Sequence, residues 1–215
     1  MMPSVALIDY GSGNLRSAAK ALERAGLDSK REAVIAVTSD PNRVRQAQRI
    51  VLPGVGAFGD CMRGLTSIAG MRDALEEAVL KRGVPFLGIC VGMQLLATTG
   101  REFGTHAGLD WIEGEVTPLA PGDPALKIPH MGWNAISIVR PHPLFAGIAT
   151  GSQVYFVHSY AMRPRDSDHV LATADHGGAF AAAVARDNIA GVQFHPEKSQ
   201  ASGLALLANF LSWRP

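Results

Sequence analysis

Short apolar runs and amphipathic segments alternate along the first hundred residues of the chain. Residues 5–10 are mostly apolar and lead into a glycine-rich turn, which is typical of a buried strand. The segment after that turn places Leu15, Ala18 and Leu22 on one face of a helix, and Gly26 stands where a helix commonly ends. Continued in this way, the pattern predicts strands over residues 33–37, 49–52 and 84–89, and helices over residues 41–48, 71–82 and 91–98.

Turn and capping residues support several of these boundaries. Asp40 and Pro41 suit the cap and the first position of a helix. Pro53 and Gly54 are expected to stop the third strand. Gly83 is expected to end the helix predicted over residues 71–82. Strands that alternate with helices over short connections predict a parallel sheet covered on both faces.

The second half of the chain has a different pattern of hydrophobic and polar residues. Short strand-like runs follow one another, with Asp187 and Asn188 as a hairpin turn between the last two. A closing helix is predicted over residues 203–213, and residues 120–124 resemble an inserted loop. We therefore predict one α/β domain over residues 1–215, with an antiparallel extension built from strands over residues 135–139, 154–157, 170–174, 181–185 and 189–194.

Composition and charge narrow the function classes. Hydrophobic residues make up 47% of the 215 and charged residues 18%, which favours a folded globular chain. A net charge of +1 gives no electrostatic reason to expect nucleic acid or an anionic membrane as partner. Two cysteines exclude a disulfide framework and fit the cytoplasm, and the N-terminus lacks the basic segment of a signal peptide. Residues 83–100 are uncharged, but their glycines and proline indicate a buried strand, turn and helix rather than a membrane span.

Cys90 is the candidate nucleophile. It occupies the centre of a G-x-C-x-G motif, Gly88–Gly92, between a predicted strand and a predicted helix. A sharp turn of this kind lifts a nucleophile off the sheet, and a helix start favours the thiolate. The N–H of Val91 would point at the anion formed when Cys90 attacks a carbonyl. The alternative is a buried, inert cysteine, which is the interpretation we favour for Cys61, because Cys61 lacks this setting.

His195 is the candidate general base. It follows an apolar strand, and Glu197 stands two residues on, so both side chains face the same way in an extended segment. Glu197 could then hydrogen-bond one imidazole nitrogen while the other faces Cys90. The alternative is a histidine at a strand end beside an unrelated surface glutamate.

A second oxyanion donor could come from the glycine-rich turn after the third strand. Gly54 and Gly56 flank Val55, so the peptide between Gly54 and Val55 could flip at little steric cost. The alternative is an ordinary strand-to-helix turn. The turn at residues 11–14 lacks the further residues of a phosphate-binding loop, so we do not expect a nucleotide there.

Three motifs together resemble a known family. They are residues 52–56 (LPGVG), 88–96 (GICVGMQLL) and 191–199 (GVQFHPEKS), and they are similar to the class I, or triad, glutamine amidotransferases. Residues 9–14 (DYGSGN), 129–134 (PHMGWN) and 155–160 (YFVHSY) resemble, within that family, the glutaminase subunits of imidazole glycerol phosphate synthases. The similarity covers nearly the whole chain and is weakest around Asp123.

The resemblance implies a flavodoxin-like amidotransferase fold and hydrolysis of glutamine to glutamate and ammonia through a cysteinyl thioester. It implies no metal and no organic cofactor. By the family motifs, Cys90 would be the nucleophile, His195 the acid and base, and Glu197 the residue that orients His195. The remaining roles that it implies are an oxyanion hole at Val91, Gly54 and Val55 and substrate binding by Gln94, Ser159 and Tyr160.

The resemblance also implies a partner, a (β/α)₈-barrel cyclase subunit that forms a heterodimer with this chain. Ammonia would pass through that barrel to a ribonucleotide precursor, giving imidazole glycerol phosphate for histidine synthesis and an aminoimidazole carboxamide ribonucleotide. Residues Asn14, Trp133, Tyr155 and Lys198 would lie at the interface.

Three alternatives remain at this stage. The chain could serve another amidotransferase pathway, because the triad does not separate pathways. It could be a stand-alone cysteine hydrolase of γ-glutamyl substrates. A regulatory module without catalysis is disfavoured by the intact Cys90, His195 and Glu197.

Overall fold

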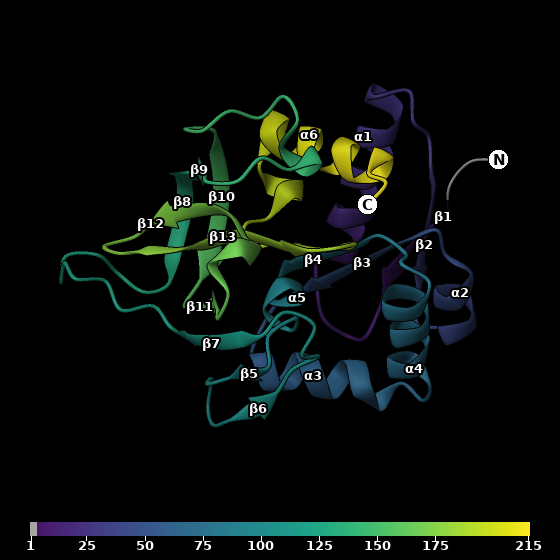
Figure 1. Cartoon of the computed structure of the whole chain (residues 1–215), viewed down its shortest axis with the longest axis horizontal. Coiled ribbons are helices and arrows are strands. Elements are labelled where there is room, and N and C mark those ends of the chain that lie inside the picture. Colours follow the sequence, from purple (N-terminus) through teal and green to yellow (C-terminus); the bar gives the residue numbers. More distant parts are fainter. Residues whose placement is uncertain (1–3) are drawn as a thin grey trace.

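A mixed eight-stranded sheet runs through the molecule in the computed structural model, which describes residues 4–215. Residues 1–3, part of the N-terminal segment discussed above, lie outside the described residues. One half of the sheet is parallel, and the other half is antiparallel (Figure 1). In spatial order its strands are β2 (Val34–Thr38), β1 (Ser4–Ile8), β3 (Arg49–Gly54), β4 (Phe86–Cys90), β14 (Ile189–Val192), β13 (Ala179–Arg186), β12 (Val170–Asp175) and β9 (Ser137–Ile138).

Helices cover the parallel half of the sheet on both faces. On one face α1 (Leu15–Asp28) packs against α6 (Gln200–Ser212), and on the other α2 (Pro41–Gln46) and α3 (Phe58–Ser67) pack against α4 (Met71–Leu75) (Figure 1). A π-helical segment, η1 (Glu76–Lys81), continues α4. Because both faces are covered, the central strand β4 is buried along its whole length. The predicted α/β architecture with an antiparallel extension is confirmed.

Two smaller sheets lie beside the antiparallel half. A two-stranded ribbon joins β8 (His130–Ala135) to β10 (Gln153–His158). The other sheet has four short strands, and three 3₁₀ turns complete the chain. These elements are β11 (Tyr160–Pro164), β7 (Gly114–Pro118), β5 (Thr99–Gly100), β6 (His106–Ala107), η2 (Pro143–Phe145), η3 (Ser167–His169) and η4 (Pro196–Lys198).

Two predicted boundaries are wrong because tertiary packing overrides the local signal. Gly26 does not end the first helix, which continues to Asp28. A Cβ at Gly26 would lie 3.2 Å from the carbonyl oxygen of Arg31, so a close backbone approach explains the glycine. Pro53 and Gly54 do not stop the third strand either, because both pair in parallel with the last two residues of β4.

The helix predicted over residues 91–98 is only one turn long, α5 (Val91–Gln94). The backbone beyond it pairs with a distant loop instead of with itself. The carbonyl of Leu95 accepts the N–H of Leu109, and the carbonyl of Leu96 accepts the N–H of Trp111. These long-range bonds end the helix early.

Other predictions missed whole elements. The strand predicted over residues 135–139 is instead the end of β8 followed by the short β9, and β8 itself begins at His130.

Helix α3 was not predicted. Its cap residue, Ala57, has no side-chain oxygen, and the first N–H of the helix, from Phe58, is bound by the carboxylate of Glu102 at 2.7 Å. A cap supplied from so far along the chain leaves no local signal.

No helix within residues 4–215 is long and apolar enough to cross a membrane. The uncharged segment that contains Cys90 forms β4, a sharp turn and α5, in agreement with the prediction.

The close approach of α5 to β3 gives a test of the fold. A Cβ on Gly92 would lie 1.8 Å from the carbonyl oxygen of Leu52, so the backbone must move to accept one. We predict that Gly92→Ala lowers the free energy of unfolding by about 3 kcal/mol or more. Urea unfolding measures this change.

Gly122→Ala is the matched control. The nearest atom to a Cβ on Gly122 is 3.5 Å away, which is ordinary van der Waals contact. This variant should stay within about 0.5 kcal/mol of the parent chain. Similar stabilities for the two variants would contradict the close packing of α5 on β3.

Candidate active site

Cys90 lies at the junction of β4 and α5, in a strained turn. Its φ of 55° and ψ of −114° are unusual for a residue with a side chain. Glycine is needed beside it, because a Cβ on Gly88 would lie 2.4 Å from the carbonyl oxygen of Gly92. The turn therefore has the geometry of a nucleophile elbow, and it presents the thiol at the first turn of a helix.

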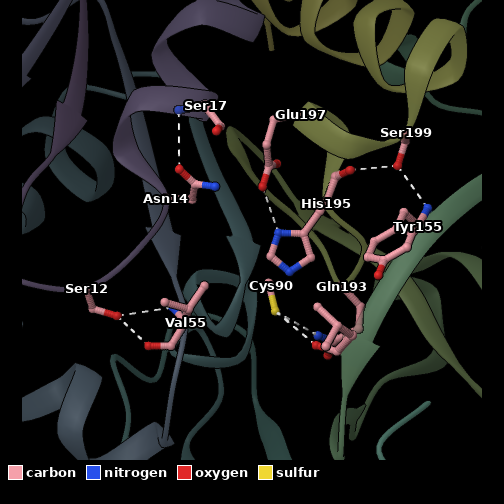
Figure 2. Close-up of polar contacts among 11 residues, drawn as sticks. Ser12, Asn14, Ser17, Val55, Cys90, Tyr155, Gln193, His195, Glu197 and Ser199 are labelled. Atoms are coloured by element: carbon pink, nitrogen blue, oxygen red, sulfur yellow. Dashed lines mark hydrogen bonds and ion pairs between the residues drawn. The ribbon is translucent and has the colours of Figure 1, made fainter. Parts of the chain in front are cut away.

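His195 and Glu197 come from the segment that follows β14. Because β14 is parallel to β4, the carboxyl ends of the two strands meet at one edge of the sheet and bring His195 to Cys90. The imidazole Nδ1 of His195 lies 2.8 Å from the Glu197 carboxylate. Figure 2 shows the ring between Glu197 and Cys90, with its other nitrogen on the side of the sulfur. That nitrogen, Nε2, is buried without a hydrogen-bond partner among the described residues.

The backbone of His195 is fixed by its neighbours. Its N–H donates to the carbonyl of Tyr155, and its own carbonyl accepts the hydroxyl of Ser199 at 2.6 Å. Ser199 in turn accepts the N–H of Tyr155 at 3.0 Å (Figure 2). The segment that carries the imidazole is thus tied to β10.

The electrostatics of the site favour a protonated His195. Burial alone would disfavour the imidazolium, but its interactions with Cys90 and with Glu197 outweigh this and raise the pKa of His195 to about 9. His195 is therefore the group that holds the proton given up by the Cys90 thiol. The arrangement can support nucleophilic attack by sulfur, followed by donation of the proton to a leaving group.

A cavity of about 420 Å³ opens in front of this pair. Its wall includes Cys90, His195 and all three predicted substrate residues, Gln94, Ser159 and Tyr160. The sequence analysis did not single out several other residues of the wall, two of which stand out chemically. Glu102 contributes a carboxylate, and Phe103 is 87% exposed at the mouth in a left-handed conformation.

The side chain of Gln94 is oriented by its partners. Its Nε2 donates to the carbonyl of Tyr160 and to the Oε1 of Gln193, both at 3.0 Å. Both amide hydrogens are thereby used. The Oε1 of Gln94 remains an acceptor for a ligand.

The two predicted oxyanion donors, the N–H groups of Val91 and Val55, differ in whether they are already hydrogen-bonded. The N–H of Val91 belongs to the first turn of α5, where the helix offers it no partner. The N–H of Val55 instead donates to the hydroxyl of Ser12 at 3.1 Å, and that hydroxyl donates to the carbonyl of Val55 at 2.5 Å (Figure 2). Gly54 is buried in β3 beside Cys90. Ser12, which the sequence analysis did not single out, therefore holds the second predicted donor.

Cys61 lies behind this turn rather than in the wall of the cavity. Its sulfur is 3.3 Å from the Ser12 hydroxyl and 3.4 Å from the carbonyl of Val55. Burial raises the pKa of its thiol. This environment is that of an inert cysteine, as the sequence suggested.

Three of the four predicted interface residues form one cluster. Trp133 and Tyr155 are paired directly across β8 and β10, with ring centroids 6.0 Å apart, and the ammonium of Lys198 is 5.5 Å from the Tyr155 ring. Trp133 is 47% exposed. Asn14 instead caps α1 by accepting the N–H of Ser17 at 3.4 Å, and α1 packs against η4, which carries Lys198.

Within residues 4–215, no group of three or more histidine, cysteine, aspartate or glutamate side chains could hold a metal ion.

Comparisons with known proteins place the chain among enzymes that use glutamine. Residues 6–213 match the family model described as "Glutamine amidotransferase class-I". The chain is 64% identical, over 100% of both chains, to the "Imidazole glycerol phosphate synthase subunit HisH" of Caulobacter vibrioides. It is 60% identical to the protein of the same name from Rhodospirillum rubrum, over 98% of this chain and 99% of that one. A glutamine amidotransferase structure from Thermotoga maritima has a similar fold, with a TM-score of 0.65 at 17% identity over 92% of this chain and 77% of that one.

The raised pKa of His195 has a measurable consequence. We predict that the His195 imidazole titrates near pH 9 by NMR, and that Cys90→Ser or Glu197→Gln lowers the midpoint, because each removes an interaction that favours the imidazolium. Since the folded pKa lies above the ordinary value of 6.5, the stabilisation is complete below pH 6.5 and is lost as the pH rises through about 9. It amounts to about 3 kcal/mol. A wild-type midpoint at or below 6.5 would contradict the arrangement.

Proposed function

Since the chain belongs to the class I glutamine amidotransferase family, as a member of its HisH group, we propose that it hydrolyses glutamine and delivers the ammonia to a cyclase partner in histidine biosynthesis. One observation carries the proposal. Cys90, His195 and Glu197 meet at one edge of the sheet, and the first two line a cavity that also holds the polar groups of Gln94 and Glu102. The family match over residues 6–213 supports a single amidotransferase domain.

The geometry supports acyl transfer through a thioester. With the thiol proton already held on Nε2 of His195, the Cys90 sulfur attacks the side-chain amide carbon of glutamine as a thiolate. The tetrahedral intermediate breaks its carbon–nitrogen bond, His195 protonates the departing nitrogen, and ammonia leaves. Water then attacks the glutamyl thioester with the now neutral His195 as base, which releases glutamate and restores the sulfur and the protonated imidazole. Glu197 keeps the imidazole in the tautomer and orientation that both steps need.

The wall of the cavity provides contacts for free glutamine. Glu102 is the only acidic residue among the wall residues of this cavity, and its carboxylate suits the α-ammonium group of the substrate. The unused Oε1 of Gln94 and the backbone of Ser159 and Tyr160 complete the polar wall. Recognition of the α-ammonium group would distinguish free glutamine from a glutamine within a peptide.

The oxyanion hole requires a local rearrangement. Val91 offers one N–H, whereas the N–H of Val55 is bound to Ser12. A flip of the peptide between Gly54 and Val55 would bring a second N–H to the developing oxyanion, and one such donor changes the rate by about 10²–10³. We propose that the free chain is a poor glutaminase for this reason, and that the partner, with its own ligand bound, promotes the flip.

We propose that the partner is a (β/α)₈-barrel cyclase that forms a heterodimer with this chain. The exposed rings and methyl groups of Ile128, Met131 and Trp133 provide an apolar surface on and beside β8, next to the cationic end of Lys198. Passage of ammonia through the barrel would yield imidazole glycerol phosphate. The names of the relatives from Caulobacter vibrioides and Rhodospirillum rubrum support this assignment.

A stand-alone hydrolase of γ-glutamyl compounds is the second candidate. A preformed oxyanion hole would favour it, and the bond from Val55 to Ser12 disfavours it. The two candidates differ in whether the free chain turns over substrate as fast as the complex does.

Separation of the two chemistries tests the proposal. In the complex with the cyclase, Cys90→Ser should abolish glutamine-dependent synthesis, because the variant lacks the nucleophile. Synthesis from added ammonium should persist, because acceptor chemistry belongs to the partner. Cys61→Ser is the matched control and should keep most of the glutamine-dependent synthesis. Loss of both activities in an assembled Cys90→Ser complex would contradict the proposal.

Release of the Val55 N–H from Ser12 tests the regulation. Ser12→Ala removes hydrogen bonds of about 1 kcal/mol, so the flipped peptide should become more populated. We predict that glutamate release by the free chain rises about fivefold, while the maximal rate of the activated complex is unchanged. Ser67→Ala, which alters an exposed serine on α3, should change neither rate. An unchanged basal rate in Ser12→Ala would argue against the peptide flip.

A further inference from the structure

We propose that Gln193 is a further catalytic residue of this site, whose amide N–H donates to the sulfur of Cys90 and stabilises the attacking thiolate. The inference rests on the proposed function and adds a group to its machinery. Gln193 directly follows β14 and is completely buried. Its Nε2 lies 3.7 Å from the sulfur, within reach of an N–H···S hydrogen bond (Figure 2).

The direction of this hydrogen bond follows from the groups behind it. A backbone carbonyl can only accept, so Gln94 must present its NH₂ group to the carbonyl of Tyr160. The second hydrogen of that NH₂ group then points at Gln193, whose Oε1 must accept it. Gln193 consequently turns its own NH₂ group toward Cys90. A flipped amide would bring two NH₂ groups together and would offer the sulfur an oxygen.

The carbonyl of Tyr160 is itself held in place. The Nδ1 of His158 lies 2.8 Å from it and must donate. The Nε2 of His158 therefore accepts from the Nδ1 of His130 at 3.0 Å, and the Nε2 of His130 accepts from the amide of Asn134 at 3.2 Å. Each bond has one donor and one acceptor only while both imidazoles are neutral.

The environment keeps these two histidines neutral. Burial lowers the pKa of both His130 and His158 to about 4. The titratable groups that face them act in the same direction. His176 stacks on the ring of His130 with centroids 4.3 Å apart, and a charge on His195 disfavours one on His158. The carbonyl of Tyr160 therefore keeps both of its donors, Gln94 and His158, at neutral pH.

The sulfur needs this donor because another of its polar neighbours, besides His195, is an acceptor. The carbonyl of Val157 lies 3.9 Å from the sulfur and suits the thiol proton. When His195 holds that proton, the carbonyl oxygen faces a negatively charged sulfur and destabilises it. An N–H donor to a charged group contributes about 1.5–3 kcal/mol, so the amide of Gln193 offsets this opposition.

Alkylation of Cys90 by iodoacetamide tests the proposal without glutamine or a partner. Gln193→Met keeps the length of the side chain and removes the donor. We expect Cys90 to be labelled about tenfold more slowly at neutral pH, which corresponds to about 1.4 kcal/mol. Gln48→Met is the matched control and should label at the wild-type rate, because Gln48 is exposed and precedes the amino end of β3, opposite the end that carries the site. Peptide mapping separates Cys90 from Cys61.

A merely structural role would move the labelling in the opposite direction. Looser packing exposes buried thiols and accelerates their alkylation, and buried Cys61 reports on this in the same sample. The proposal requires that Cys90 slows while Cys61 does not change. A Cys90 rate that is unchanged or raised in Gln193→Met would overturn it.

A second pair of variants tests the orientation of the amide. The amide nitrogen of asparagine can take the place of the Nδ1 of His158, so His158→Asn can still donate to the carbonyl of Tyr160, whereas His158→Leu cannot. We expect His158→Leu to slow Cys90 alkylation severalfold and His158→Asn to stay within about twofold of wild type. Equal rates in the two variants would overturn the role of this series of hydrogen bonds in orienting Gln193.

The two proposals can fail separately. If the wild-type complex hydrolyses glutamine but Gln193→Met alkylates at the wild-type rate, only the role of Gln193 is wrong. If the wild-type complex does not hydrolyse glutamine, the proposed function is wrong whatever the labelling shows.

Discussion

The strained backbone at Cys90 is the constraint on which the site depends. A residue with a side chain in this conformation costs about 1–3 kcal/mol, and the surrounding structure must impose it. Here β3 and β14 pair with β4 on its two sides up to the turn, and α5 packs so closely on β3 that only glycine fits at position 92. The same pairing sets Gly54 beside Cys90 and carries His195 to the edge of the sheet. The geometry of the candidate site is thus set by the register of the parallel strands.

The sequence predicted the features that depend on neighbours in the chain. The turn around Cys90 is encoded by two glycines at fixed spacing, and the pairing of His195 with Glu197 by a separation of two residues. Both appear in the structure, although their catalytic roles remain proposals. Ser12, Glu102 and Gln193 were missed because their partners lie far along the chain. The predicted helix over residues 91–98 failed for the same physical reason, since its carbonyls bind a loop that its own sequence does not specify.

Histidines in this molecule are driven to opposite charge states by their surroundings. His195 faces a carboxylate and a thiol, and its pKa is raised to about 9 despite burial. His130 and His158 face each other and neutral amide groups, and burial lowers the pKa of each to about 4. At neutral pH a charged imidazole therefore stands near two neutral ones. In the proposed mechanism proton transfer is therefore confined to His195, while the other two serve as fixed hydrogen-bonding groups.

Glu102 links the proposed substrate preference of the cavity to the integrity of a helix. One oxygen of its carboxylate holds the first N–H of α3, which lies 44 residues earlier in the chain, while the side chain also lines the cavity. In the course of evolution, a lineage that adapted to a substrate without a cationic end could not simply discard this acid, because α3 would lose its cap. A substitute cap would have to arise at Ala57 first, where serine, threonine or aspartate could supply one locally. A new cap for α3 must therefore come before any loss of Glu102 that changes the substrate.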